Sequence, residues 1–389
     1  MKNEISLKRK DINNYLFPIY YWGFTFLNPI VSKAGEYSTL ILLIFALMMF
    51  SLWLLVILRK KAVNISVFIG FGFLLILALD MLIRSNSKSF DYIYKYIYAG
   101  FLVILFVSII NDSTKTLKVF SVLSVCAFLL FFYDPFLDYK FLGDYMGYGF
   151  NLVLPAFIGI FILCHYYKKW WLLPLEIFCL ALILIYANRS AFLTAIIFIL
   201  LYYLTMHKKR KIILGFLVFT TLTLFLLLEH IILFVMEIFV KLDLNTYAIQ
   251  QFIKFIQFRD TESFFSGRFD IWQNAWNMFL SKPILGHGAG YFHAVHGTYP
   301  HNIVLDILVT YGIIGIIAIG LLIFMSFYKL AKNNGQNKLL GLLFLSLWFP
   351  KLVFSVYFIV DEGFWAFIAY GFLFFNGIAL NKEVKDGKS

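Results

Sequence analysis

Apolar runs about as long as a bilayer is thick recur along this chain of 389 residues and constrain its fold more than any other feature. A transmembrane helix needs about 20 consecutive apolar residues, and that requirement selects twelve candidate spans. They lie near 12–32, 38–58, 63–83, 91–110, 117–133, 146–165, 170–187, 190–206, 212–230, 302–327, 339–358 and 363–380. Only 14% of the residues are charged, against about 25% in an average soluble domain. The sequence therefore predicts an all-α polytopic integral membrane protein, with residues 1–389 forming a single membrane domain.

The distribution of lysine and arginine predicts how these spans are oriented. Basic clusters recur in alternate loops, at 8–10, 59–61, 115–118, 168–169, 208–211, 329–332 and 382–385. Because cytoplasmic loops of membrane proteins carry the excess of positive charge, we expect both termini in the cytoplasm. This pattern also accounts for most of the net charge of +12, so the charge gives no reason to expect nucleic acid as a partner.

One long loop, residues 231–301, connects the ninth and tenth predicted spans on the outer side. Four aromatic residues recur in it at helical spacing, opposite polar ones: Phe269, Trp272, Trp276 and Phe279. This pattern predicts an amphipathic helix, which either lies in the headgroup plane or packs on the bundle. A glycine-rich turn follows at 282–290, where backbone N–H groups could approach a phosphate or the chain could simply reverse.

Four histidines gather in the same loop: His287, His293, His296 and His301. They lack a His-x-x-x-His pair or a neighbouring cysteine cluster, so we predict no metal site. His301 stands out because it lies where the loop enters the tenth predicted span. Imidazole exchanges a proton near neutral pH, which makes His301 a candidate acid or base at the membrane surface. The alternative is a structural histidine beside a helix-capping asparagine, Asn302.

Further residues of this tenth span accompany His301. Nine residues separate Asn302 from Gly312, which is followed by Gly315. Two glycines on one helix face predict close approach of a neighbouring helix or a lipid. Asp306 follows His301 by five residues and would orient it or line the same pocket.

Ionisable residues also lie within other predicted spans, where they are costly and usually face the bundle interior. They are Asp80, Glu176 and Lys351. Structural pairing, for example of Asp80 with Lys351, and a role in substrate binding are equal alternatives for them.

Two arginines lie on the outer side, where positive charge is scarce. Arg189 begins the eighth predicted span, and Arg268 begins the amphipathic helix, whose N-terminus already favours anions. A guanidinium group matches the paired oxygens of a phosphate or diphosphate. Snorkelling or a structural ion pair is the alternative for either arginine alone.

Three ordered motifs within residues 185–320 resemble those of the O-antigen ligase and polymerase superfamily, membrane glycosyltransferases that act on lipid-linked oligosaccharides. The segment 189–193 is similar to an Arg-x-x-x-Leu motif. Residues 267–288 are similar to a loop pattern of Gly-Arg, Trp and Pro-x-x-Gly-x-Gly. Residues 301–315 resemble the signature His-Asn, nine residues, Gly-x-x-Gly.

The resemblance implies a GT-C-like bundle in the bacterial inner membrane, with its active site on the periplasmic side. It implies an inverting, metal-independent glycosyl transfer without a cofactor, from a donor linked to undecaprenyl diphosphate. Arg189 and Arg268 would hold the diphosphate, and His301 would act as base on the acceptor hydroxyl. Supporting residues would be Asn302, Asp306, Gly312 and Gly315.

Within that superfamily we expect an O-antigen polymerase, which joins lipid-linked repeat units, because the strongly aromatic loops suit recognition of a strain-specific sugar. The alternative is an O-antigen ligase, which moves finished polymer onto lipid A–core, and the His-Asn-Gly-x-x-Gly pattern leans towards it. A lipid-linked oligosaccharide flippase is a further alternative, but its charged groups would line a path across the bilayer. Expected partners are the lipid-linked donor, the acceptor glycan and other polysaccharide-export proteins.

Overall fold

The computed structural model describes residues 12–60, 62–84, 86–132, 147–185, 189–206, 268–354, 357–373 and 378–379, with single residues at 215, 237 and 241. The predicted span at 212–230, apart from residue 215, and the loop before residue 268 lie outside the described residues. Nearly all regular structure in the described part is helical. The exception is a pair of two-residue antiparallel strands, β1 (Ala62–Val63) and β2 (Ile378–Ala379). The prediction of an all-α protein is thus confirmed for the described part, apart from this short pair.

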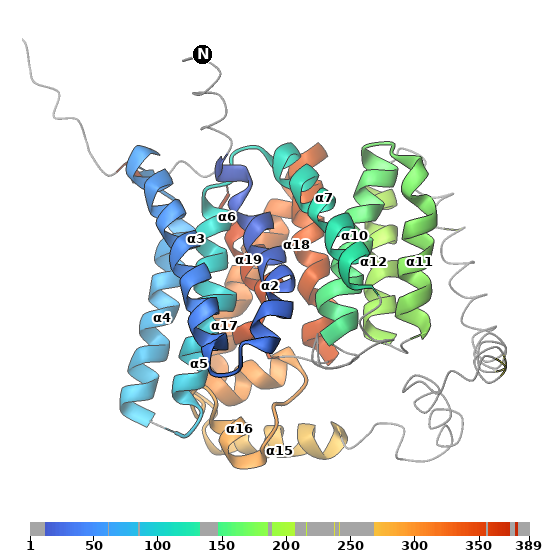
Figure 1. The fold of residues 1–389 in the computed structure, drawn as a ribbon. Coiled ribbons are helices and arrows are strands. Elements are labelled where there is room, and N and C mark those ends of the chain that lie inside the picture. Colours follow the sequence, from blue (N-terminus) through green and yellow to red (C-terminus); the bar gives the residue numbers. More distant parts are fainter. Residues whose placement is uncertain are drawn as a thin grey trace, which may run out of the picture.

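The helices form one bundle with a layer of shorter helices across one end (Figure 1). The upright helices are α2 (Leu16–Lys33), α3 (Ser38–Lys60), α4 (Ile65–Arg84), α5 (Ser89–Tyr96) continued by η3 (Ile97–Phe101) and α6 (Leu102–Ser108), α7 (Ser113–Phe131), η4 (Tyr148–Val153) continued by α10 (Leu154–Phe161) and η5 (Ile162–Tyr166), α11 (Leu173–Ile185), α12 (Arg189–Met206), α17 (Ile303–Lys332), α18 (Gly335–Phe354) and α19 (Glu362–Gly371). Single turns of 3-10 helix are η1 (Ile12–Asn14), η2 (Gly35–Tyr37), η6 (Trp170–Leu172) and η8 (Phe358–Val360). Helices α15 (Arg268–Ser281) and α16 (Tyr291–His296) lie below the bundle in Figure 1, and we call this end the α15 end.

Six of the described helical segments are long and apolar enough to cross a membrane. They are Gly35–Arg59, Ile65–Arg84, Ser89–Ser108, Ser113–Phe131, Tyr148–Tyr166 and Ile303–Lys332. Two shorter apolar helices, Trp170–Ile183 and Ser190–Met206, accompany them. These segments support a polytopic membrane protein, whereas the number of twelve spans stays a prediction.

The last predicted span, 363–380, is wrong in its second half. Helix α19 ends at Gly371, and Ile378–Ala379 form strand β2 against β1. The side-chain amide of Asn64 donates to the Phe372 carbonyl at 2.9 Å, directly after the helix ends. The apolar composition of this window predicts burial, but the helix end depends on these contacts with the distant segment 62–64.

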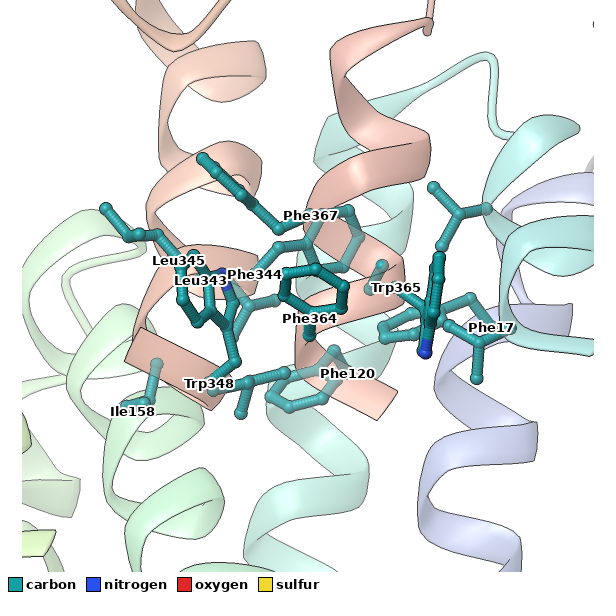
Figure 2. Packing of buried hydrophobic residues seen from close by; sticks show 14 of the residues in the cluster. Phe17, Phe120, Ile158, Leu343, Phe344, Leu345, Trp348, Phe364, Trp365 and Phe367 are labelled. Atoms are coloured by element: carbon teal, nitrogen blue, oxygen red, sulfur yellow. The ribbon is translucent and has the colours of Figure 1, made fainter. Parts of the chain in front are cut away.

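Aromatic side chains from helices far apart in the sequence fill the centre of the bundle (Figure 2). Phe17 of α2, Phe120 of α7, Trp348 of α18, and Phe364 and Trp365 of α19 are each at most 2% exposed. The rings of Trp348 and Phe364 meet edge to face, with centroids 5.4 Å apart. Rings of this size bury large apolar areas and dominate core energetics. This cluster therefore holds the central helices of the bundle together, and the α15 end is built on these helices.

The amphipathic helix is present as α15, but its buried face differs from the predicted one. Ala275 and Phe279 are buried in a small cluster with Val309 of α17. Phe269 is 71% exposed and Trp276 is 47% exposed, although both belonged to the predicted apolar face. The small Ala275 side chain allows close packing on α17, which turns part of the aromatic stripe outward. Helix α15 thus packs on the bundle and also leaves aromatic side chains exposed.

Candidate functional site

His301 lies at the α15 end, directly before the first turn of α17. Its backbone is left-handed, with φ +54°, which is uncommon for a residue other than glycine. Its ring packs on that of Tyr299 with centroids 4.2 Å apart, and its Nε2 lies 3.4 Å from the Thr298 hydroxyl oxygen. The side chain is partly exposed. The geometry presents an imidazole to the surface of the α15 end in a defined orientation.

Asn302 and Asp306 hold the start of α17 in place. The Asn302 side-chain oxygen accepts hydrogen bonds from the N–H groups of Val304 and Leu305, at 2.9 and 3.2 Å. The capping role considered for Asn302 is therefore present. The buried carboxylate of Asp306 accepts from the Phe358 N–H at 3.3 Å, which ties α17 to the turn η8.

Gly312 interrupts the helical backbone of α17, and a loop packs against the interruption. Its φ is +63° and its ψ is −155°, a conformation essentially restricted to glycine. The carbonyl groups freed before the break accept from the N–H groups of His287 and Gly288, at 2.8 and 2.9 Å. After the break, the Ile313 N–H donates to the Pro283 carbonyl at 2.9 Å. The expectation that a helix or lipid approaches here is thus wrong, because the loop occupies the space and satisfies the broken helix.

Gly315 and the glycine-rich turn also differ from what the sequence suggested. A β-carbon at Gly315 would meet Ile307 and Tyr311, which belong to the same helix. The N–H groups of His287 and Gly288 bond to α17 carbonyls, and that of Ala289 bonds to a carboxylate. These three donors are used within the protein, so the turn serves to reverse the chain and not to cradle a phosphate.

The C-terminal end of α4 holds this turn from the other side. Asp80 Oδ2 accepts from the Ala289 N–H at 2.5 Å, and Asn86 Nδ2 donates to the Ala289 carbonyl at 3.0 Å. Arg84 donates to both carbonyls of 285–286, at 3.2 and 3.1 Å, and lies 3.7 Å from the Asp80 carboxylate. Helix α4 therefore fixes the loop that fixes the α17 break, across about two hundred residues of sequence.

The ionisable residues predicted inside spans pair differently from the example given above. Asp80 pairs with Arg84, and Lys351 pairs with Asp361, Nζ to Oδ2 at 3.0 Å. Glu176 lies 3.2 Å from His165 Nε2, between α11 and η5. Arg84 is the i+4 neighbour of Asp80, so that pairing was already available from the sequence spacing. The pairing of Lys351 with Asp361 depends on how α18 packs beside the start of α19.

The backbone of Arg189 reaches the α15 end, while its side chain lies outside the described part of the structure. The end of α12 contacts η5 through Tyr203 and His165, and Tyr167 directly after η5 donates to the Thr114 carbonyl at the start of α7. The neighbouring Ser113 donates to Asn337 at the start of α18. The end of α12 and the start of α18 therefore lie at the same end of the bundle, so the two helices are antiparallel. Since α18 ends at the α15 end, α12 begins there.

Arg268 begins α15 and is half-buried, so the structure brings it to the same end of the bundle as His301. Arg84 is a further cation of this end, and none of the three sequence motifs includes it. The sequence feature that could have identified Arg84 is its position directly after the third predicted span, on the predicted outer side and four residues after Asp80.

Of the remaining loop histidines, His287 has two polar partners through its Nε2 atom. His287 Nε2 lies 2.9 Å from the Met278 carbonyl, to which it donates, and 2.8 Å from the Ser281 hydroxyl. Burial lowers the pKa of His287, and burial together with Lys88 lowers the pKa of His293. Both imidazoles are therefore favoured in the neutral form. Within the described ranges, no three His, Cys, Asp or Glu side chains gather as metal ligands would.

Residues 174–320 match the family model described as O-antigen ligase. The chain carries a domain of the O-antigen ligase and polymerase superfamily. This domain includes all three predicted substrate or catalytic positions: Arg189, Arg268 and His301. No curated protein is similar enough to the chain to count as a match.

The O-antigen ligase domain supports a membrane enzyme of the ligase or polymerase type, which uses lipid-linked polysaccharide. Together with the apolar helices, it supports a multi-pass protein of the inner membrane. Part of the contacts that position its loop come from outside the domain, since the end of α4 lies beyond the matched residues.

Proposed function

We propose that this protein is an O-antigen or polysaccharide polymerase, an inverting glycosyltransferase that joins repeat units carried on undecaprenyl diphosphate. The observation that carries the proposal is the position of the three predicted residues. Arg189, Arg268 and His301 all fall within the matched domain, and the helices that begin at or just after them, α12, α15 and α17, start at the same end of the bundle.

In the proposed reaction, the bond between the anomeric carbon of the donor glycan and its diphosphate oxygen breaks. A new bond forms between that carbon and the acceptor hydroxyl oxygen, with inversion, and undecaprenyl diphosphate leaves. His301 takes the proton of the attacking hydroxyl, which makes the oxygen a better nucleophile. Arg189 and Arg268 hold the diphosphate and stabilise the charge that develops on it.

The proposed reaction takes place on the outer side of the cytoplasmic membrane. The charge pattern places the basic loops in the cytoplasm. His301 and Arg268 belong to the opposite end of the bundle, where α15 and α16 lie. A reaction at that end meets lipid-linked repeat units after they have crossed the membrane.

An O-antigen ligase is the second candidate function, and two observations favour it. The matched family model is described as O-antigen ligase, and the His-Asn, nine residues, Gly-x-x-Gly pattern at 301–315 leans the same way. A ligase would use the same arginines and the same base, with lipid A–core as the acceptor.

A deletion strain complemented in parallel with wild type, His301→Ala or His296→Ala tests the proposal. His296 is an exposed histidine of α16 and serves as the matched control. Surface polysaccharide and the undecaprenyl-linked pool are resolved on gels. We expect the deletion strain to show core capped by one repeat unit, and a ladder to return with wild type and His296→Ala but not with His301→Ala.

Two other outcomes would change the assignment. Bare core, with long polymer stranded on undecaprenyl diphosphate, would make the protein the ligase. Full-length chains with His301→Ala would refute the role of His301 as base and would favour a transporter.

A further inference from the structure

A continuous row of aromatic rings runs inward from His301, and the proposed function does not use it. The Tyr299 ring lies 4.2 Å from the His301 ring and 5.0 Å from that of Tyr357, centroid to centroid. The Tyr357 ring stacks in turn on Tyr92 of α5 at 4.9 Å. Segments around residues 92, 299 and 357 thus meet beside the candidate base.

A charged pair borders this row. Lys95 Nζ lies 2.7 Å from Asp91 Oδ2, and it donates to the Tyr357 hydroxyl at 3.3 Å. The side chains of Lys95 and Asp91 are 40% and 39% exposed. An ion pair this exposed contributes little to stability. Its donors and acceptors remain accessible beside the aromatic row.

The combination of rings and charges matches the chemistry of a sugar. A pyranose has an apolar face of C–H groups and a rim of hydroxyl groups. Binding sites for small molecules use apolar and aromatic walls with a few placed polar groups. Here Tyr299 and His301 offer ring surface, while Asp91 and Lys95 offer an acceptor and a donor for hydroxyl groups.

A membrane-interface belt is the competing explanation for clustered tyrosines. Belt residues face lipid and headgroups, so their rings are exposed. Tyr92 is 3% exposed and Tyr357 is 7% exposed, and both are stacked behind Tyr299. The inner part of the row is therefore packed to support the outer ring and does not face lipid.

Tyr299 and His301 lie inside the family domain, but the residues that surround them in this cluster come from outside it. Asp91, Tyr92, Lys95 and Tyr357 all fall outside the matched residues 174–320, whereas Arg189 and Arg268 fall inside. A family-wide donor chemistry needs the same diphosphate contacts in each member. The acceptor sugar differs between polysaccharides, and segments outside the domain suit its recognition.

We propose that Tyr299, Asp91 and Lys95, supported by Tyr357 and Tyr92, form the subsite for the terminal sugar of the acceptor glycan. This inference rests on the proposed function, because it needs His301 to receive the proton of that sugar's hydroxyl. The ring face of the sugar packs on Tyr299. The carboxylate and ammonium groups bind its other hydroxyls and direct the attacking one towards His301.

The test uses the full-length protein in lipid nanodiscs with the strain's own undecaprenyl-diphosphate-linked repeat unit as donor. The acceptor probe is the repeat-unit oligosaccharide released from that lipid by mild acid. Initial transfer rates give acceptor KM and donor KM separately. The variants are Tyr299→Ala, Tyr299→Phe and Lys95→Met, with Phe90→Ala as control, since Phe90 is an aromatic residue of α5 with 71% exposure.

We expect Tyr299→Ala and Lys95→Met to raise acceptor KM about three- to tenfold, the effect of losing one aromatic or polar contact. Donor KM should not change in parallel, Tyr299→Phe should keep the wild-type acceptor KM, and Phe90→Ala should match wild type. Unchanged acceptor KM in Tyr299→Ala and Lys95→Met, or an equal rise in donor KM, would overturn the subsite while leaving the proposed function intact. A wild-type protein that transfers nothing to this probe or to lipid-linked units would overturn both. Melting temperatures of all variants separate these outcomes from misfolding.

Discussion

Replacing Gly312 by alanine tests whether the break in α17 is required by the fold. At φ +63° and ψ −155°, an alanine is strained by about 1–3 kcal/mol. Its β-carbon would also meet the carbonyl groups of Pro283 and Ile284. Displacing them weakens the Ile313 N–H bond to Pro283 and its neighbours, each worth about 0.5–1.5 kcal/mol. The expected loss of stability is about 2–5 kcal/mol.

Gly320→Ala is the matched control, because it is the same substitution in the same helix. Gly320 has no neighbour within 4 Å of an added β-carbon. Alanine is the better helix former by about 0.8–1.0 kcal/mol, so this variant should be as stable as wild type or more so. Both variants replace glycine by alanine, but Gly312→Ala should lower the stability of the protein, whereas Gly320→Ala should keep or raise it.

The assay is equilibrium unfolding of the purified protein in detergent, followed by tryptophan fluorescence, with thermal unfolding as a second measurement. Gly312→Ala should unfold at clearly lower denaturant concentration and temperature than wild type, and Gly320→Ala should not. If the two variants unfolded together, the reasoning from the strained backbone and the inserted loop would be wrong.

Two further predictions concern buried polar contacts. Asp80→Ala removes the acceptor of the Ala289 N–H and should cost about 1–3 kcal/mol in the same unfolding assay. Glu36→Ala, an exposed acidic residue, should change stability by less than about 0.5 kcal/mol, and equal effects of the two would argue against the α4 contact. Lys351→Met leaves the fully buried Asp361 without its cation and should cost about 3–5 kcal/mol. Adding Asp361→Asn should restore part of that loss, because an amide needs no counter-charge; a single variant as stable as wild type would contradict the pairing.

The candidate site depends on elements that lie outside the matched domain. The loop of residues 283–289 lies between the broken α17 on one side and the end of α4 on the other. The first turns of α17 are tied to η8 through Asp306. Expression of residues 174–320 alone would therefore leave this loop without its α4 contacts.

Several features could be predicted from the sequence because they depend on residues close together in the chain. Apolar runs predicted where helices form, and the described helices follow eleven of the twelve predicted ranges at least in part. The motif order predicted the family, which the match at 174–320 supports. A helix cap was one of the alternatives for Asn302, and the residue does cap α17, since capping needs only the next three residues.

Other features became apparent only in the tertiary structure, because they join residues far apart in the chain. The pattern around Gly312 suggested a helix–helix contact, but the dihedral angle of a glycine and the loop that fills its break depend on residues 283–288. In the sequence Arg84 is an ordinary cation at the end of a helix, whereas in the fold it donates hydrogen bonds to the carbonyls of a distant loop. The tyrosine row beside His301 unites residues 92, 299 and 357, which no local pattern connects. Hydropathy and helix capping are local properties that the sequence determines by itself, whereas the pairing of polar groups and rings across the bundle is decided by packing.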